Sequence, residues 1–335
     1  MLSLSMNAVI TLLFVSIVLT SSLTVHTSHN SDHLVVLSHG IMGTGEDLGY
    51  LANLLEQSGC SVLSSVSNEK LKSLTGLKTG GENLASEILN CVANNRNLKR
   101  LSVVGNSLGG LYTRYAMKLL FNDSDKTIGG LKPNRFMSIA TPHLGVQNWT
   151  FVDDFGYTAP MFVKRLVSRS MLSTGRDIFS MEDKNSEEET LLFKMATNEA
   201  FLSPLRCFLD RRLYANLNRD FVVPLGTAAF MDKASVENLR KVHDGKSGIV
   251  TVLKTPATSA NNFISAEVGQ SSDTMIERLD DLGWDKVIVN FPGLLPIAHN
   301  KICALSREPK WLYENVLGFN AGQFVMKDAN EWLTK

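Results

Sequence analysis

The chain has 335 residues, of which 44% are hydrophobic, and its 33 basic residues balance 33 acidic ones. This length and composition suffice for one large hydrophobic core or two smaller ones. The balanced charge argues against a protein that recruits nucleic acid through a strongly basic surface.

The first 30 residues are predicted to be a targeting or anchoring segment. Residues 8–19, AVITLLFVSIVL, contain ten apolar residues in twelve, and no charge occurs from Leu2 to Val25. A short apolar stretch of this kind is typical of a signal peptide, although the positive charges that normally precede it are missing. A segment of about 20 mostly apolar residues also suits a retained membrane anchor. Both interpretations stay open, with a buried N-terminal helix as a third, and we expect a protein that is membrane-associated or in the secretory pathway.

From about residue 33 onward, short β-rich runs alternate with helical patterns. The sequence predicts strands at 33–40, 60–67, 100–105, 135–142, 211–217 and 286–292, and helices at 46–59, at 81–95 and after Ser107. This order predicts an α/β fold with a mostly parallel central sheet and helices on both of its faces. We expect one domain over residues 31–335, with a cap inserted at about 146–205, where the alternation breaks. The polar stretch between 217 and 286 is interpreted as loops and one helix.

A serine lies at the sharpest corner of this pattern. Gly105-Asn106-Ser107-Leu108-Gly109 fits G-x-S-x-G, with a buried strand before it and an amphipathic helix after it. The two glycines let strand and helix approach closely, so that the corner presents the Ser107 hydroxyl above the sheet. An ordinary helix N-cap serine would need neither glycine. We therefore predict that Ser107 is a nucleophile and that the Leu108 N–H, at the helix start, stabilises an oxyanion.

A nucleophilic serine needs a base and an acid that orients the base. In this architecture they follow the serine in the order acid, then histidine, each just beyond a strand. Asp220 follows the strand that ends near residue 217, and His299 follows the strand that ends near residue 291. The other later histidine, His243, has no strand before it. Each residue alone could be structural, as a turn former or a helix cap, but the joint pattern predicts the triad Ser107, Asp220 and His299.

The loop after the first core strand, SHGIMGTG at 38–45, is predicted to supply the second oxyanion donor. Its glycines leave room for a backbone N–H, that of Ile41, to point at a substrate carbonyl. His39 is expected to hold this loop, and His143, in TPHLG, to line the site or brace the cap. The chain has no HExxH, no P-loop and no GxGxxG after a strand, so we expect neither a metal nor another cofactor.

An amphipathic segment in the insertion suggests a lid. In APMFVKRLVSRSML, residues 159–172, one helical face would carry Phe162, Val163, Leu166 and Val167, and the other Lys164, Arg165 and Arg169. A basic amphipathic helix beside an active site can lie in a membrane interface. The alternative is a helix that packs its apolar face on the core.

Several blocks of the chain, in order from about residue 33 to 303, resemble a known family, the eukaryotic serine esterases and lipases of the α/β-hydrolase fold. The blocks are HLVVLSHGIMG, TGLKTGGENLASEI, GNSLGGLYTRYA, IATPHLGV, LRCFLDRRLYANLNRDFVVPLGTA and LGWDKVIVNFPGLLPIAHN. The resemblance implies Ser107 as nucleophile, Asp220 as orienting acid and His299 as base. The N-terminal apolar segment and the PLGTA stretch after Asp220 depart from the family pattern, and neither touches the triad.

We therefore expect a serine hydrolase that cleaves carboxylic esters, those of lipids, through an acyl-enzyme. One alternative is a thioesterase or acyltransferase that uses the same triad. The other is a non-catalytic, membrane-associated protein with a hydrolase fold, whose mark would be a lost triad member. The expected partners are an acyl-ester substrate and a membrane surface, with no nucleic acid and no obligate protein partner.

Overall fold

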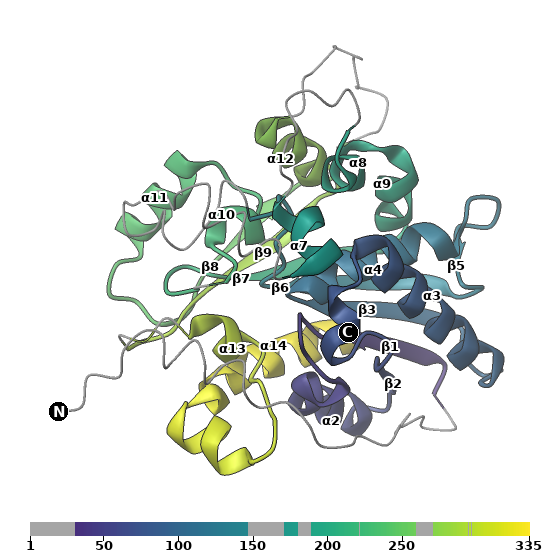
Figure 1. Cartoon of the computed structure of the whole chain (residues 1–335), viewed down its shortest axis with the longest axis horizontal. Coiled ribbons are helices and arrows are strands. Elements are labelled where there is room, and N and C mark those ends of the chain that lie inside the picture. Colours follow the sequence, from purple (N-terminus) through teal and green to yellow (C-terminus); the bar gives the residue numbers. More distant parts are fainter. Residues whose placement is uncertain are drawn as a thin grey trace.

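The computed structural model describes residues 31–146, 171–179, 189–220, 222–258, 271–293, 295 and 297–335 (Figure 1). The predicted N-terminal segment and nearly all of the amphipathic stretch 159–172, including its four apolar residues, lie outside these ranges. No helix of the described part is both long enough and apolar enough to cross a membrane.

A single seven-stranded sheet forms the centre of the fold, in the order β2-β1-β3-β6-β7-β9-β8. Its strands are β1 (His33–Ser38), β2 (Ser61–Ser64), β3 (Arg100–Asn106), β6 (Lys132–Ile139), β7 (Asp210–Asn216), β8 (Gly248–Thr255) and β9 (Trp284–Asn290). Every pairing is parallel except that of the edge strand β8, which runs antiparallel to β9. The prediction of a mostly parallel central sheet is confirmed. A separate short hairpin pairs β4 (Phe121–Asn122) with β5 (Thr127–Ile128).

The central strands are apolar on both sides because each side of the sheet has its own core. In β1, Leu34 and Val36 belong to one apolar cluster, while Val35 and Leu37 belong to the other. This division follows from the geometry of a strand, whose successive side chains point to opposite faces. A strand covered on both faces therefore has a continuous apolar sequence, as β1 does.

Helices cover both faces of the sheet (Figure 1). The first core includes residues of α3 (Leu77–Ala93), α4 (Leu108–Leu120), α7 (Leu172–Phe179), α8 (Leu191–Thr197), α9 (Glu199–Arg206), α10 (Leu225–Ala228), α11 (Lys233–Val242) and α12 (Ser272–Asp280). The second includes residues of η1 (Gly45–Leu48), α2 (Gly49–Gln57), α13 (Ala298–Ile302), η4 (Trp311–Val316), η5 (Phe319–Gly322) and α14 (Gln323–Thr334). A further short helix, η2 (Lys70–Leu74), precedes α3.

Two long segments between the strands carry further helices. The insertion between β6 and β7 carries α7, α8 and α9, and α8 packs against α12. The interpretation of residues 217–286 as loops and one helix was wrong, since the described part of this stretch contains three helices, α10 to α12, and the edge strand β8. The run GIVTVLKT of β8 is rich in β-branched residues, a strand signal that the surrounding polar residues obscured.

Candidate active site

Ser107 lies between β3 and α4 in a strained backbone conformation, with φ 54° and ψ −127°. Glycine tolerates a positive φ at little cost, whereas other residues adopt it mainly where surrounding structure enforces it. The neighbouring glycines allow the corner to be this tight. A Cβ on Gly109 would lie 2.2 Å from the Ser38 carbonyl oxygen, and a Cβ on Gly40 would lie 2.8 Å from the Ser107 Cβ. The predicted turn from strand to helix at Ser107 is therefore present.

The other two predicted residues lie beside this serine. The Ser107 Oγ is 2.9 Å from the Nε2 of His299, and the His299 Nδ1 is 3.0 Å from one carboxylate oxygen of Asp220. With a neutral imidazole, the serine hydroxyl donates to Nε2 and the Nδ1–H donates to the carboxylate. His299 is on α13, after β9, and Asp220 follows β7. Ser107 and Asp220 are 192 and 79 residues away from His299 in the sequence, and the fold brings all three together at the carboxyl ends of the parallel strands.

Four donors fix the orientation of the Asp220 carboxylate. Besides His299, the backbone N–H groups of Val222 and Val223 donate to Oδ1 at 3.0 and 2.8 Å. The side-chain amide of Asn216 donates to Oδ2 at 2.7 Å. Asn216 was not predicted from the sequence, where the only signal is a polar residue at the end of a buried strand. Its hydrogen bond connects the strand β7 directly to the carboxylate.

Two backbone N–H groups near Ser107 make no hydrogen bond within the described part of the chain. One is that of Leu108, the first residue of α4, and the other is that of Ile41. Ile41 belongs to a tight turn that the Gly43 N–H closes on the Gly40 carbonyl at 3.1 Å. Free donors of this kind are what an oxyanion hole requires. The His39 Nδ1 lies 2.9 Å from the Gly40 carbonyl, so this buried imidazole contacts the same turn, in keeping with the predicted holding role.

His143 is fully buried behind the site and does not line its surface. Its Nε2 is 2.9 Å from the Ser138 Oγ, and its Nδ1 is 3.2 Å from the Arg114 guanidinium. Arg114, on α4, also donates to the Met195 carbonyl of α8. Burial, reinforced by the nearby positive charges, lowers the pKa of His143 well below its ordinary range, so this imidazole is neutral. Of the two predicted roles, lining the site and bracing the cap, these contacts favour the second, because His143 lies in a buried network that joins α4 to α8 of the insertion.

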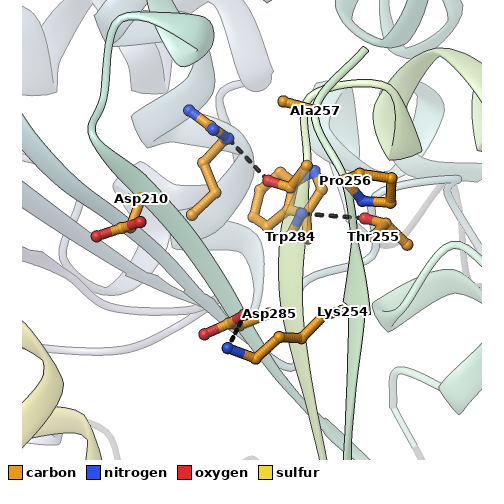
Figure 2. Close-up of a pocket in the computed structure, with 9 residues that line it drawn as sticks. Asp210, Lys254, Thr255, Pro256, Ala257, Trp284 and Asp285 are labelled. Atoms are coloured by element: carbon orange, nitrogen blue, oxygen red, sulfur yellow. Dashed lines mark hydrogen bonds and ion pairs between the residues drawn. The ribbon is translucent and has the colours of Figure 1, made fainter.

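His243 is not part of this arrangement, as its place in the sequence suggested. It follows α11 in an exposed turn, with its Nδ1 3.4 Å from the Lys246 amine. Among the described residues, no three His, Cys, Asp or Glu side chains are grouped to hold a metal ion. A hollow of about 400 Å³ lies where β7 and β9 begin and β8 ends, lined by residues that include Asp210, Lys254 and Trp284 (Figure 2). This hollow lies at the amino ends of β7 and β9, whereas Ser107 lies at the carboxyl end of β3.

The fold is that of the α/β-hydrolases, and Ser107, His299 and Asp220 lie in it in the arrangement of a nucleophile, a base and an orienting acid. The chain belongs to the family described as "Putative serine esterase (DUF676)", whose sequence profile matches residues 28–234. The resemblance recognised in the sequence is thereby confirmed.

Similar proteins come from fungi. The protein named "Putative lipase C4A8.10" of Schizosaccharomyces pombe is 27% identical in an alignment of 297 residues that covers 82% of this chain and 36% of that protein. "Putative lipase ROG1" of Saccharomyces cerevisiae is 28% identical in an alignment of 243 residues that covers 69% of this chain and 34% of that protein. The chain thus spans about a third of the length of these relatives. Among solved structures, Aspergillus fumigatus lipase B is 14% identical, with a TM-score of 0.42 over 67% of this chain and 49% of that one.

Proposed function

We propose that this protein is a serine hydrolase that cleaves carboxylic esters of lipids through an acyl-enzyme on Ser107. The observation that carries the proposal is the distance of 2.9 Å between the Ser107 Oγ and the His299 Nε2, because a serine hydroxyl becomes nucleophilic only when a base can take its proton. The lipid part of the proposal is supported by the fungal relatives, which are named as lipases.

The first half of the reaction forms the acyl-enzyme. His299 accepts the hydroxyl proton as the Ser107 Oγ attacks the ester carbonyl carbon, and the carbonyl oxygen becomes an oxyanion. The N–H groups of Leu108 and Ile41 donate to this oxyanion. The bond to the alcohol oxygen then breaks, and His299 gives its proton to the departing alcohol.

The second half returns the enzyme to its starting state. His299 takes a proton from water, the resulting hydroxide attacks the acyl carbon, and the bond to Ser107 breaks with return of the proton to its Oγ. Asp220 holds the imidazole with Nδ1–H toward the carboxylate in both halves, and stabilises the imidazolium that forms. A second acyl acceptor, an alcohol in place of water, would turn the same residues into an acyltransferase.

Active-site labelling and a substrate panel test the proposal. We expect a fluorophosphonate probe to modify Ser107 in the wild-type protein, and Ser107→Ala to abolish the labelling. His299→Ala should lower ester turnover by on the order of a thousandfold or more, with the fold retained. The matched control, His243→Ala, changes a histidine in an exposed turn and should leave turnover unchanged.

The outcomes separate the alternatives. Faster turnover of thioesters, or transfer to an added alcohol exceeding hydrolysis, would replace the ester hydrolase with the corresponding activity on the same triad. A wild-type protein that takes no label and turns over no acyl donor would support the non-catalytic interpretation.

A further inference from the structure

One buried serine, Ser73 at the end of η2, contacts the loop that carries the proposed oxyanion donor Ile41. The Ser73 Oγ accepts a hydrogen bond from the Met42 N–H at 2.8 Å and donates to the Lys70 carbonyl at 2.6 Å. Met42 is the residue after Ile41 and has a positive φ of 53°. A non-glycine residue held in that conformation depends on its surroundings, and here the Ser73 hydroxyl supplies the acceptor for its N–H.

The backbone carbonyl of the same serine connects two further elements. It accepts from the Tyr112 hydroxyl of α4 at 2.7 Å and from the Thr174 hydroxyl of α7 at 2.8 Å. The Thr174 Oγ1 in turn accepts from the Gly76 N–H at 2.9 Å. Ser73, Tyr112 and Thr174 are all fully buried. The turn beside the nucleophile, the nucleophile helix and the first described helix of the insertion therefore meet at one residue.

The turn from Gly40 to Gly43 also receives support from the segment just before Ser73. The Lys70 N–H donates to the Gly43 carbonyl at 3.0 Å, and the Gly45 N–H donates to the Glu69 carboxylate at 2.9 Å. These bonds hold the far end of the turn, and His39 contacts the Gly40 carbonyl before Ile41, so Ser73 is the side chain that holds the peptide directly after Ile41. Loss of its hydroxyl would leave the Met42 N–H without an acceptor, and the turn would relax to recover a hydrogen bond. A change of about 1 Å in a catalytic donor is enough to affect turnover strongly.

We propose that Ser73 is a positioning residue that aims the Ile41 N–H at the substrate oxyanion and makes this aim depend on the position of α7. The inference rests on the proposed function, since it concerns the same oxyanion. The hydroxyl of Ser73 acts on the loop, and its carbonyl links the loop to α4 and α7.

The test compares Ser73→Ala with Ser102→Ala, a matched control. Ser102 is also fully buried and hydrogen-bonded, at 2.7 Å to the His33 Nε2, but its partners lie near the beginnings of the strands. The probes are p-nitrophenyl butyrate for turnover and an alkyl trifluoromethyl ketone, whose adduct with the serine places an alkoxide in the oxyanion hole. For Ser73→Ala we expect kcat lower by about 10- to 100-fold with KM nearly unchanged, and ketone affinity weaker by a similar factor.

A second pair of variants tests the link to α7 without changing Ser73. Thr174→Val removes the hydroxyl that bridges the Ser73 carbonyl and the Gly76 N–H, while Thr174→Ser keeps it. We expect Thr174→Val to weaken ketone binding by about 3- to 10-fold and Thr174→Ser to restore it. Hydrogen exchange gives a readout that is independent of activity, since peptides covering residues 39–48 should exchange faster in Ser73→Ala and Thr174→Val than in their controls.

Each result bears on one proposal or the other. If Ser73→Ala and Ser102→Ala lower the unfolding temperature alike and leave ketone affinity and loop exchange unchanged, Ser73 is structural only and the inference is wrong. If Ser73→Ala does not fold, equal behaviour of Thr174→Val and Thr174→Ser overturns it instead. Suppose instead that the wild-type protein turns over no ester while residues 39–48 still exchange faster in Ser73→Ala than in the wild type. That result would contradict the proposed function but support the contact between Ser73 and the loop.

Discussion

Ser107 has a backbone conformation that its side chain alone would disfavour, and the contacts around it explain why it persists. The Ser107 N–H donates to the Ile139 carbonyl of β6 at 2.8 Å, and the Gly110 N–H donates to the Ser107 carbonyl at 3.0 Å. Glycines at the neighbouring contacts remove the side chains that would prevent this packing. The cost of a strained residue, on the order of 1–3 kcal/mol, is thus offset by fixed hydrogen bonds on both sides of it.

The residues that the sequence predicted differ from those that it missed in how their contacts arise. Ser107, Asp220 and His299 could be predicted because each comes within ten residues after a strand, and the carboxyl ends of parallel strands lie together. Ser73 and Asn216 could not, since their roles depend on single hydrogen bonds. The bond between Thr174 and the Ser73 carbonyl spans 101 residues and leaves no pattern in the sequence.

His33 supplies a prediction about pH and stability. Burial lowers the pKa of this imidazole from the ordinary value of 6.5 to about 4, and the Arg100 charge acts in the same direction. The unfolded chain therefore takes up a proton at this residue between pH 6.5 and 4, whereas the folded protein does not. The stability that His33 contributes is present above pH 6.5 and is lost as pH falls. From pH 7 to pH 5 the loss amounts to about 2 kcal/mol.

Equilibrium denaturation at the two pH values measures this loss. His33→Gln keeps a polar side chain near Ser102 but cannot titrate, so the variant should lose about 2 kcal/mol less than the wild type between pH 7 and pH 5. The buried His143 is present in both proteins, and its contribution cancels in the comparison. Equal losses in the two proteins would mean that His33 is not held neutral by the fold.

At the level of elements, the sequence predicted the central strands of the sheet better than its edge strand β8. The predicted strand at 100–105 corresponds to β3, and the one at 286–292 to β9, each shifted by no more than two residues at either end. Strands buried on both faces give long apolar runs that are easily recognised. The edge strand β8 is only half buried along its length, which explains why its signal was missed. The helix after Ser107, α4, was predicted because its apolar spacing begins directly after the turn that carries Ser107.

An ion pair between two elements beside the site supplies the second prediction. Asp47 of η1 is almost fully buried, and both of its carboxylate oxygens accept from the Arg307 guanidinium at 2.7 Å. Arg307 follows α13, the helix of His299. Arg307→Ala would leave a buried carboxylate without its partner, so we expect it to lower the free energy of unfolding by about 3–5 kcal/mol.

Two further variants make this measurement specific. Arg307→Lys retains the charge but loses the two-pronged geometry, and should lie between the wild type and Arg307→Ala. Arg96→Ala removes an exposed arginine on the other side of the sheet and should change stability by less than about 0.5 kcal/mol. A loss in Arg307→Ala no larger than that in Arg96→Ala would show that η1 and the segment after α13 are held together by other contacts.

For the whole molecule, the sheet separates two cores, and the candidate site lies at the carboxyl ends of its parallel strands. Loops that follow β1, β3, β7 and β9 converge on Ser107, while the hollow of Figure 2 lies at the amino ends of β7 and β9. Side chains from both cores therefore hold the strands that carry the site. An α/β scaffold of this kind is rigid, and its loops carry the chemistry.

The apolar N-terminal segment leads to the last prediction, which concerns where the molecule resides. β1 begins at His33, and the charge-free run from Leu2 to Val25 ends before it. We expect the full chain to fractionate with membranes or to enter the secretory pathway, and deletion of residues 1–30 to move it into the soluble fraction. Turnover of a soluble ester should stay within about twofold, because the strands and loops of the site lie after residue 31.

A charge-substitution variant distinguishes membrane insertion from other effects of the deletion. Leu13→Arg combined with Val15→Arg leaves the length unchanged but makes insertion of the segment unfavourable by about 2.5–3.5 kcal/mol for each charge. Mass measurement of the purified protein then separates the two interpretations, since a signal peptide would be removed and an anchor retained. A full-length protein that is soluble, cytosolic and intact at its N-terminus would contradict both, and would leave the apolar segment to pack against the protein itself.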